Sequence, residues 1–156
     1  MSIDFSTMRR EYGDRGLEIS NMPADPMQQL SSWVDEALAA GVFDATAMIL
    51  STVDEEGYPD ARVVLLKGMQ EGNLIFFTHY HSAKGLQLER HPWVALTFYW
   101  SELARQVRIR GSVKRISVVD SDMYFAQRPV LSQVSAIISP QSQPIPDRSY
   151  LEHAAA

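Results

Sequence analysis

Apolar residues recur at two different spacings along the chain, and the change of spacing divides it into predicted helices and strands. After Asp25-Pro26, apolar residues return every three or four positions until Gly41, which predicts an amphipathic helix with Asp25 as its N-cap. Shorter runs rich in β-forming residues follow and predict five strands. These strands are Ala47–Val53, Ala61–Leu66, Leu74–Thr78, Trp93–Tyr99 and Gln106–Val113.

Cap residues and turn residues complete this pattern. Three further helices are predicted: one from Ser82 to His91-Pro92, one from Ser117 to about Gln127, and one that begins at Asp147. The turn Glu71-Gly72-Asn73 is expected to join the second strand to the third. Residues 129–147 hold four of the eight prolines and four serines, so they are expected to form a loop.

Strands joined mostly by short turns, with helices inserted between them, are typical of a mainly β fold with helices, in the α+β class. The sequence therefore predicts an antiparallel β-barrel in one domain, residues 25–156, preceded by a polar arm, residues 1–24. A length of 156 residues, with 46% hydrophobic and 21% charged residues, fits one globular domain with its own core.

The composition removes several classes of function. The chain has no cysteine, which excludes disulfides, thiolate zinc sites and cysteine nucleophiles. A net charge of −5 argues against general nucleic-acid binding, which depends on neutralising phosphates. No apolar run approaches the roughly 18 residues of a membrane span, and the first 16 residues lack a secretory signal pattern. We therefore expect a cytoplasmic protein with no membrane or nucleic-acid partner.

The first candidate binding residues lie in the stretch from Arg62 to Lys67, in which a cation stands on each side of four apolar residues. A charge beside a buried run needs a partner, because an unpaired charge in a dry site costs several kcal/mol. A carboxylate could be the partner of these cations, but further cations in the chain favour a phosphate. Arg62 is at an even position and Lys67 at an odd one, so a straight strand places their side chains on opposite faces. They can serve one ligand only if one lies beyond the strand end, and otherwise they serve two phosphates.

Two other groups of residues could bind phosphate. Lys84 falls in the first turn of the helix that Ser82 caps, where free N–H groups favour anions; a solvated lysine is the simpler alternative. Tyr124, Arg128 and Ser132 recur at intervals of four across a predicted helix end. A guanidinium between two hydroxyls would clamp a phosphate, and an aromatic–cation surface pair is the alternative.

Most of the other polar clusters have a structural explanation. Five cations, Arg105, Arg108, Arg110, Lys114 and Arg115, are expected on the outer face of a strand, while the Gln106 amide could bind a polar heterocycle. His79 and His81 have no carboxylate or cysteine at metal-ligand spacing, so no metal site is expected. No nucleophile elbow, Walker loop or dinucleotide fingerprint occurs, and no catalytic side chain is assigned.

Taken in order, the motifs of the chain resemble those of the pyridoxine (pyridoxamine) 5′-phosphate oxidase family. The matching motifs are Arg9-Arg10-Glu11-Tyr12, Pro23-Ala24-Asp25-Pro26, Thr46-Ala47-Met48, Thr52-Val53-Asp54-Glu55, Arg62 to Lys67, Phe77-Thr78, Ser82 with Lys84, Arg105-Gln106-Val107, Tyr124-Phe125, Arg128-Pro129, Ser132-Gln133 and Gln141-Ser142. The resemblance implies an FMN-binding, antiparallel split β-barrel that forms a homodimer, with FMN at the subunit interface.

The resemblance also implies roles for individual residues. FMN would contact Arg62, Val63, Val64, Leu65, Leu66, Lys67, Phe77, Thr78, Lys84, Gln106, Gln141 and Ser142. Of these, Arg62, Thr78, Lys84 and Ser142 would hold its phosphate, and Gln141 and Ser142 would reach across from the partner subunit. The substrate would contact Arg9, Tyr12, Lys67, Tyr124, Arg128 and Ser132, with Arg9 and Tyr12 on a mobile arm that closes over it.

The implied reaction is oxidation of pyridoxamine or pyridoxine 5′-phosphate by O₂ to pyridoxal 5′-phosphate, with H₂O₂, in vitamin B6 biosynthesis and salvage. FMN would accept a hydride from the substrate C4′ carbon. Two departures from the family pattern stand out: Ala83 replaces an arginine beside Lys84, and a C-terminal segment with a Trp, an Arg and an Arg-x-His is absent. The alternatives are a truncated homologue that binds FMN or pyridoxal phosphate without turnover, or another FMN-dependent oxidoreductase on this fold.

Overall fold

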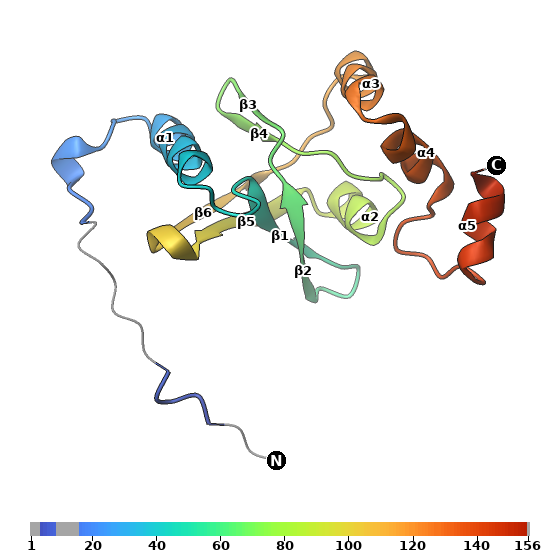
Figure 1. The fold of residues 1–156 in the computed structure, drawn as a ribbon, viewed down its shortest axis with the longest axis horizontal. Helices are drawn as coiled ribbons and strands as arrows, with labels where there is room; N and C mark the ends of the chain where they lie inside the picture. Colours follow the sequence, from blue (N-terminus) through green and yellow to red (C-terminus); the bar gives the residue numbers. More distant parts are fainter. Residues whose placement is uncertain (1–3, 9–15, 156) are drawn as a thin grey trace.

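The structure is a computed structural model that describes residues 4–8 and 16–155. Its centre is an antiparallel sheet of four strands in the order β2-β1-β5-β6 (Figure 1). The strands are β1 (Ala47–Val53), β2 (Pro59–Leu65), β5 (Trp93–Trp100) and β6 (Arg105–Ser112). A separate two-stranded hairpin consists of β3 (Gly68–Gln70) and β4 (Asn73–Ile75). The predicted α+β class with antiparallel strands is confirmed.

The described residues also form five α-helices: α1 (Pro26–Ala39), α2 (Ala83–Arg90), α3 (Val118–Gln127), α4 (Val130–Ile138) and α5 (Arg148–Ala154). Short 3₁₀ turns occur at Ile19–Asn21 and Ser101–Leu103. Figure 1 shows α1 on one side of the sheet and α3 to α5 beyond its other side, with α2 between them and the sheet. None of the helices in the described part of the chain is long and apolar enough to cross a membrane.

The core lies between one face of the sheet and α1. Even-numbered residues of β1 and β5 point inward, and the three buried side chains of α1 pack with them. The buried hydrophobic residues on these elements are Leu30, Val34, Ala37, Met48, Leu50, Leu96, Phe98 and Trp100. Trp100 donates its indole N–H to the Ala45 carbonyl at 2.8 Å, so this large ring is buried with its polar group satisfied.

The start of α2 is held by a tight turn. Ser82 is fully buried, and its hydroxyl donates to the His79 carbonyl at 2.6 Å while accepting from the Gly85 N–H at 3.3 Å. A Cβ on Gly85 would lie 2.2 Å from the Tyr80 carbonyl oxygen, so only glycine allows the helix to approach this turn so closely. The N-terminus of α2 is therefore fixed relative to residues 79–82.

Three sequence predictions about elements are wrong, and one strand was not predicted. Residues 129–147 are not one loop, because Val130–Ile138 forms α4 with Pro129 as its N-cap; the proline occupies a position where no helical N–H is needed. The turn at residues 71–73 joins β3 to β4 and does not join β2 directly to the next strand. The three-residue strand β3 was not predicted, and β4 ends at Ile75 instead of continuing to Thr78.

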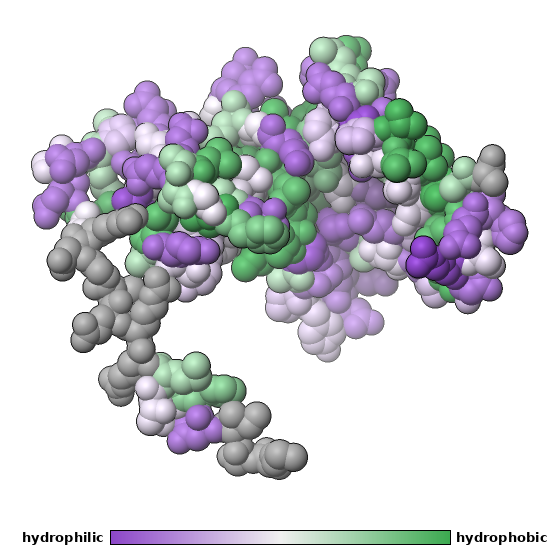
Figure 2. Space-filling model, in the orientation of Figure 1, coloured by the Kyte–Doolittle hydropathy of each residue, from purple (hydrophilic) through white to green (hydrophobic). Residues whose placement is uncertain are grey.

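The outer side of α4 remains apolar and exposed. Val130, Leu131 and Ile137 are each more than two thirds exposed, and Figure 2 shows hydrophobic atoms gathered over this helix. The opposite side of α4 carries its serines and faces the site described next.

Candidate functional site

A groove of about 830 Å³ runs between the end of β2, the turn before α2, and the helices α3 and α4. Its volume is within the usual range of small-molecule sites, about 300–1,000 Å³. Residues from distant parts of the sequence meet there: Val63, Val64, Leu65, Lys67, Phe77, Thr78, His79, Tyr80, His81, Lys84, Ser121, Tyr124, Phe125, Arg128, Pro129, Ser132, Ser135, Ala136, Ser139 and Gln141. Most residues that the sequence predicted for cofactor and substrate are in this set.

Arg62 and Lys67 lie on opposite faces, as their parity predicted. Val63, Leu65 and Lys67 follow the outer face of β2 into the groove, and Lys67 comes after the last residue of the strand. The Lys67 N–H donates to the Ile75 carbonyl at 2.8 Å, which anchors its backbone on the β3–β4 hairpin. Arg62 points to the inner face and does not line the groove.

Lys84 is the cation at the N-terminal end of α2, and its ammonium group donates to the Gln141 side-chain oxygen at 2.9 Å. Burial lowers the pKa of Lys84, nearby Arg62 lowers it further, and Asp60 opposes both effects. A half-buried ammonium beside a second cation is a site where an anion is favourable. The Lys84–Gln141 contact forms within one chain, so it does not require the partner subunit.

The three predicted clamp residues come together at the junction of α3 and α4. Arg128 is the C-cap of α3, Ser132 lies in the first turn of α4, and Tyr124 lies one turn before Arg128. All three line the groove. The Tyr124 ring stacks on Phe77 with 3.5 Å between ring centroids and 5° between planes. Arg128 lies 5.9 Å from the Phe125 ring, so its aromatic neighbour is Phe125 and not Tyr124.

Several predicted contact residues lie outside the groove. Leu66 is buried in the core, and Gln106 is exposed on β6 opposite Tyr99 of β5. Ser142 follows Gln141 with a left-handed backbone (φ 69°) but does not line the groove. Arg9 and Tyr12 fall outside the described residues, so their predicted contact with substrate stays a prediction.

Sequence reasoning missed some lining residues. His79 and His81 were assigned no binding role, and both line the groove. The His81 N–H donates to Nδ1 of His79 at 3.2 Å. Ser135 and Ser139 follow Ser132 at helical spacing, a signal that was hidden because the segment was predicted to be a loop.

Arg108 and Arg110 are exposed on the outer face of β6, as expected, but Arg105 lies on the inner face, on the same side as Trp100. Arg105 and Arg115 have structural partners. Arg105 pairs with Glu36 and lies 4.9 Å from the Trp33 ring centre, and Arg115 pairs with Glu89 at 3.2 Å. Within the described residues, His, Asp and Glu form no group of three that could hold a metal ion.

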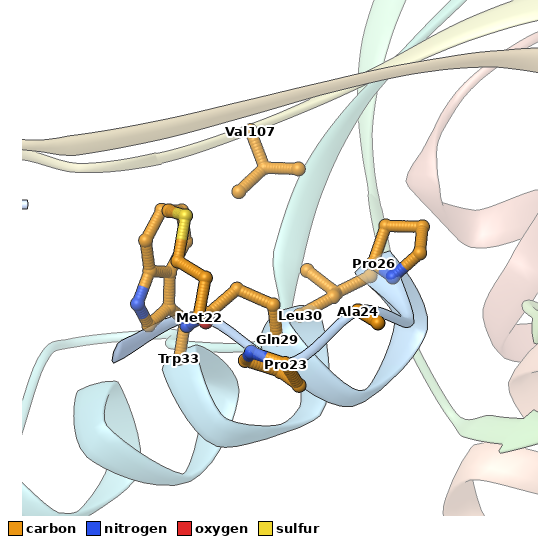
Figure 3. Close-up of a pocket in the computed structure, with 8 residues that line it drawn as sticks. All are labelled: Met22, Pro23, Ala24, Pro26, Gln29, Leu30, Trp33 and Val107. Atoms are coloured by element: carbon orange, nitrogen blue, oxygen red, sulfur yellow. The ribbon is translucent and has the colours of Figure 1, made fainter. Parts of the chain in front are cut away.

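A second, smaller hollow of about 270 Å³ lies between α1, the residues before it and β6 (Figure 3). It is lined by Met22, Pro23, Ala24, Pro26, Gln29, Leu30, Trp33 and Val107. None of these side chains is charged, so this hollow cannot neutralise a phosphate. Of the two hollows, only the larger groove is lined by cations.

The donors of the groove fit FMN and a second phosphorylated ligand. Lys84 at the start of α2 suits one phosphate, and Lys67, Arg128 and Ser132 suit another. Val63, Leu65 and Phe77 provide apolar surface for a flat ring system. The fold and the groove thus define a class: an antiparallel β-domain with a groove whose donors suit phosphorylated ligands.

Comparison with known proteins identifies the family. The sequence pattern of the family described as "Pyridoxamine 5'-phosphate oxidase" matches residues 34–156. The pyridoxine/pyridoxamine 5′-phosphate oxidase of Legionella pneumophila (strain Lens) is 55% identical over 147 residues, covering 94% of this chain and 68% of that protein. The protein of the same name from Bacteroides thetaiotaomicron is 46% identical over 151 residues, covering 97% and 71%. The chain belongs to the pyridoxamine 5′-phosphate oxidase family.

Solved structures support the same fold. PhzG from Burkholderia lata 383, in complex with tetrahydrophenazine-1-carboxylic acid, has a TM-score of 0.83 and 28% identity over 87% of this chain and 67% of that one. A pyridoxamine 5′-phosphate oxidase-related, FMN-binding protein from Nostoc punctiforme has a TM-score of 0.66 and 20% identity, covering 84% and 73%. The fold is the FMN-binding split barrel, and FMN is the cofactor that family membership implies.

Proposed function

We propose that this chain binds FMN and oxidises pyridoxamine 5′-phosphate or pyridoxine 5′-phosphate to pyridoxal 5′-phosphate. The observation that carries the proposal is that one groove holds two separate groups of phosphate donors. Lys84 lies at the start of α2, and Lys67 with Arg128 lies near the α3–α4 junction. The relatives that are 42–55% identical and carry this activity in their names support the assignment.

The reaction needs few proton-transfer groups from the protein. With the amine substrate, O₂ and water are consumed, and pyridoxal 5′-phosphate, ammonia and H₂O₂ are formed. FMN, when bound, supplies the hydride acceptor and the reaction with O₂. The chain supplies orientation, because a substrate held at its phosphate by Lys67, Arg128 and Ser132 presents its ring in a fixed position. Tyr124, held by its stack on Phe77, limits how the ring can lie.

The outer face of the sheet supports a homodimer as part of the proposal. Ile49, Val63, Leu65 and Tyr99 are between 38% and 65% exposed on this face, and exposed apolar surface of this kind is typical of interfaces. Val63 and Leu65 also line the groove, so a partner that covers this face would close the site. Gln106 lies on the same face, next to Tyr99, where it could reach FMN across the interface.

The test is a turnover assay on the purified chain. FMN is added and the visible flavin spectrum recorded, and then pyridoxamine 5′-phosphate is supplied in air. We expect a flavin spectrum perturbed by binding and formation of pyridoxal 5′-phosphate with equimolar H₂O₂. Unphosphorylated pyridoxamine is the control, and it should react far more slowly. FMN-loaded protein that forms no pyridoxal 5′-phosphate would refute the proposed reaction, and a protein that binds no FMN would refute the proposed cofactor.

A further inference from the structure

Gln87 links α2 to the two strands that lie beneath it. It follows Lys84 by three residues, so the two side chains leave α2 on the same side, one turn apart. The Gln87 side-chain oxygen accepts from the Thr52 hydroxyl at 2.5 Å and from Nη2 of Arg62 at 3.1 Å. Its side-chain N–H donates to the Asp60 carboxylate at 3.1 Å. One amide thus connects residues of β1 and β2 to the helix that carries Lys84.

Arg62 is fully occupied at its two terminal nitrogens. Nη1 donates to the Leu50 carbonyl at 3.2 Å and to the Thr52 hydroxyl at 2.6 Å, and Nη2 lies 2.5 Å from the Asp60 carboxylate in addition to its bond to Gln87. A guanidinium has four N–H donors on its two terminal nitrogens, and these four contacts can engage all of them. The side chain is 18% exposed, and its Nη2 group contacts Gln87, one turn from Lys84 on α2.

Only an amide can make all of these contacts. A carboxylate at position 87 would accept from Thr52 and Arg62 but would face the Asp60 carboxylate as a like charge. An apolar side chain would leave the buried Thr52 hydroxyl and part of Arg62 without an acceptor. The Gln87 amide therefore provides the direct link between Arg62 and α2.

We infer that Gln87 is a positioning residue for the FMN phosphate. It holds the Arg62 guanidinium and the N-terminal turn of α2 at a fixed spacing, so that the positive charges of Arg62 and Lys84 act on one phosphate. This inference rests on the proposed function, in which the FMN phosphate lies at Lys84. The residue acts through Arg62 and α2 and does not itself line the groove.

The experiment compares FMN with riboflavin, which has the same ring system but no phosphate. Dissociation constants of both are measured by quenching of flavin fluorescence for wild-type protein, Gln87→Met and Gln28→Met. Gln28 is an exposed glutamine on α1, which makes it a matched control. We expect Gln87→Met to weaken FMN binding about tenfold, the lower end of the effect of a hydrogen bond to a charged group, and to leave riboflavin binding unchanged. Gln28→Met should match wild type for both flavins.

A double-mutant comparison tests whether the effect passes through Arg62. In an Arg62→Lys background, Gln87→Met should cause little further loss of FMN affinity, because the contact that it removes is already broken. Gln87→Glu keeps the side-chain shape and serves if the methionine variant is unstable. It should weaken FMN more than riboflavin, because it adds an anion beside the phosphate.

The outcomes separate the two claims. Gln87→Met that weakens FMN and riboflavin equally, or neither, overturns the role of Gln87 even if wild-type protein prefers FMN. Additive losses from the Arg62 and Gln87 changes overturn the path through Arg62. Wild-type protein that binds riboflavin as tightly as FMN overturns the proposed phosphate site, and the inference about Gln87 with it.

Discussion

Replacing Lys84 by methionine should change ligand affinity and stability in opposite directions. The ammonium is half-buried beside Arg62, and burial is the main cause of its lowered pKa, so the charge costs the ligand-free protein some stability. Methionine keeps the apolar stem and removes that charge. We therefore expect the thermal midpoint of the ligand-free variant to equal or exceed that of wild type. The lost contact is with Gln141, an exposed residue, and should matter little for stability.

The same change should weaken FMN binding strongly. A hydrogen bond to a charged group contributes about 1.5–3 kcal/mol, which corresponds to a loss of about 10- to 150-fold in affinity. Riboflavin affinity should stay the same, since riboflavin has no phosphate for Lys84 to hold. The assay is a fluorescence titration with both flavins, together with thermal unfolding without ligand. Lys114→Met, at an exposed lysine after β6, is the matched control.

Two results would refute this reasoning. Equal losses for FMN and riboflavin would mean that Lys84 supports the groove as a whole and does not bind the phosphate. A lower thermal midpoint with unchanged FMN affinity would mean that the charge stabilises the fold. Alkaline pH offers a further check. Because the pKa of Lys84 is lowered, FMN affinity relative to riboflavin should begin to fall at a pH below the ordinary lysine value of 10.5, and the methionine variant should lack this fall.

Three further changes test other parts of the site. Phe77→Leu removes the ring stacked on Tyr124, and an aromatic pair contributes about 0.5–1.5 kcal/mol, so KM for the phosphorylated substrate should rise about two- to tenfold in steady-state assays. Gly85→Ala places a Cβ 2.2 Å from a backbone carbonyl oxygen, and chemical denaturation should show a loss of about 1–3 kcal/mol or more. The Gln87 hydrogen bond is the main cause of the lowered pKa of Asp60. The ionised carboxylate therefore stabilises the fold at pH values above 3.8, the ordinary pKa of the group, and this stabilisation disappears as the pH falls through the lowered pKa. Asp60→Asn should therefore lose less stability than wild type on acidification, as thermal unfolding at a series of pH values would show.

The sequence predicted elements well where local signals agreed. α1 begins after Asp25 and β1 spans Ala47–Val53, as expected, because a cap residue or a turn coincides there with a change of apolar period. α4 was missed because its flanking prolines dominated the composition of the segment, although Pro129 stands ahead of a regular apolar helix. β3 is only three residues long, which gives no period to detect.

Some residues of the candidate site could be predicted from the sequence and the environment of others could not, for a physical reason. Lys67, Tyr124, Arg128 and Ser132 were selected by their chemistry and spacing, and the fold brings them into one groove. The environment of Arg62 could not be predicted in the same way. Its acceptors come from neighbouring β1 and from Gln87, 25 residues further along the chain, and only the packing of α2 on the sheet brings them together.

The central claim is that one groove binds two phosphates at different ends. The most direct measurement is the affinity of Lys84→Met and Arg128→Ala for FMN, and of their FMN-saturated forms for pyridoxal 5′-phosphate. We expect Lys84→Met to lose affinity mainly for FMN and Arg128→Ala to lose affinity mainly for pyridoxal 5′-phosphate, each by about tenfold or more. Release of FMN by Arg128→Ala, or equal losses of both ligands in both variants, would contradict the division of the groove into two phosphate sites.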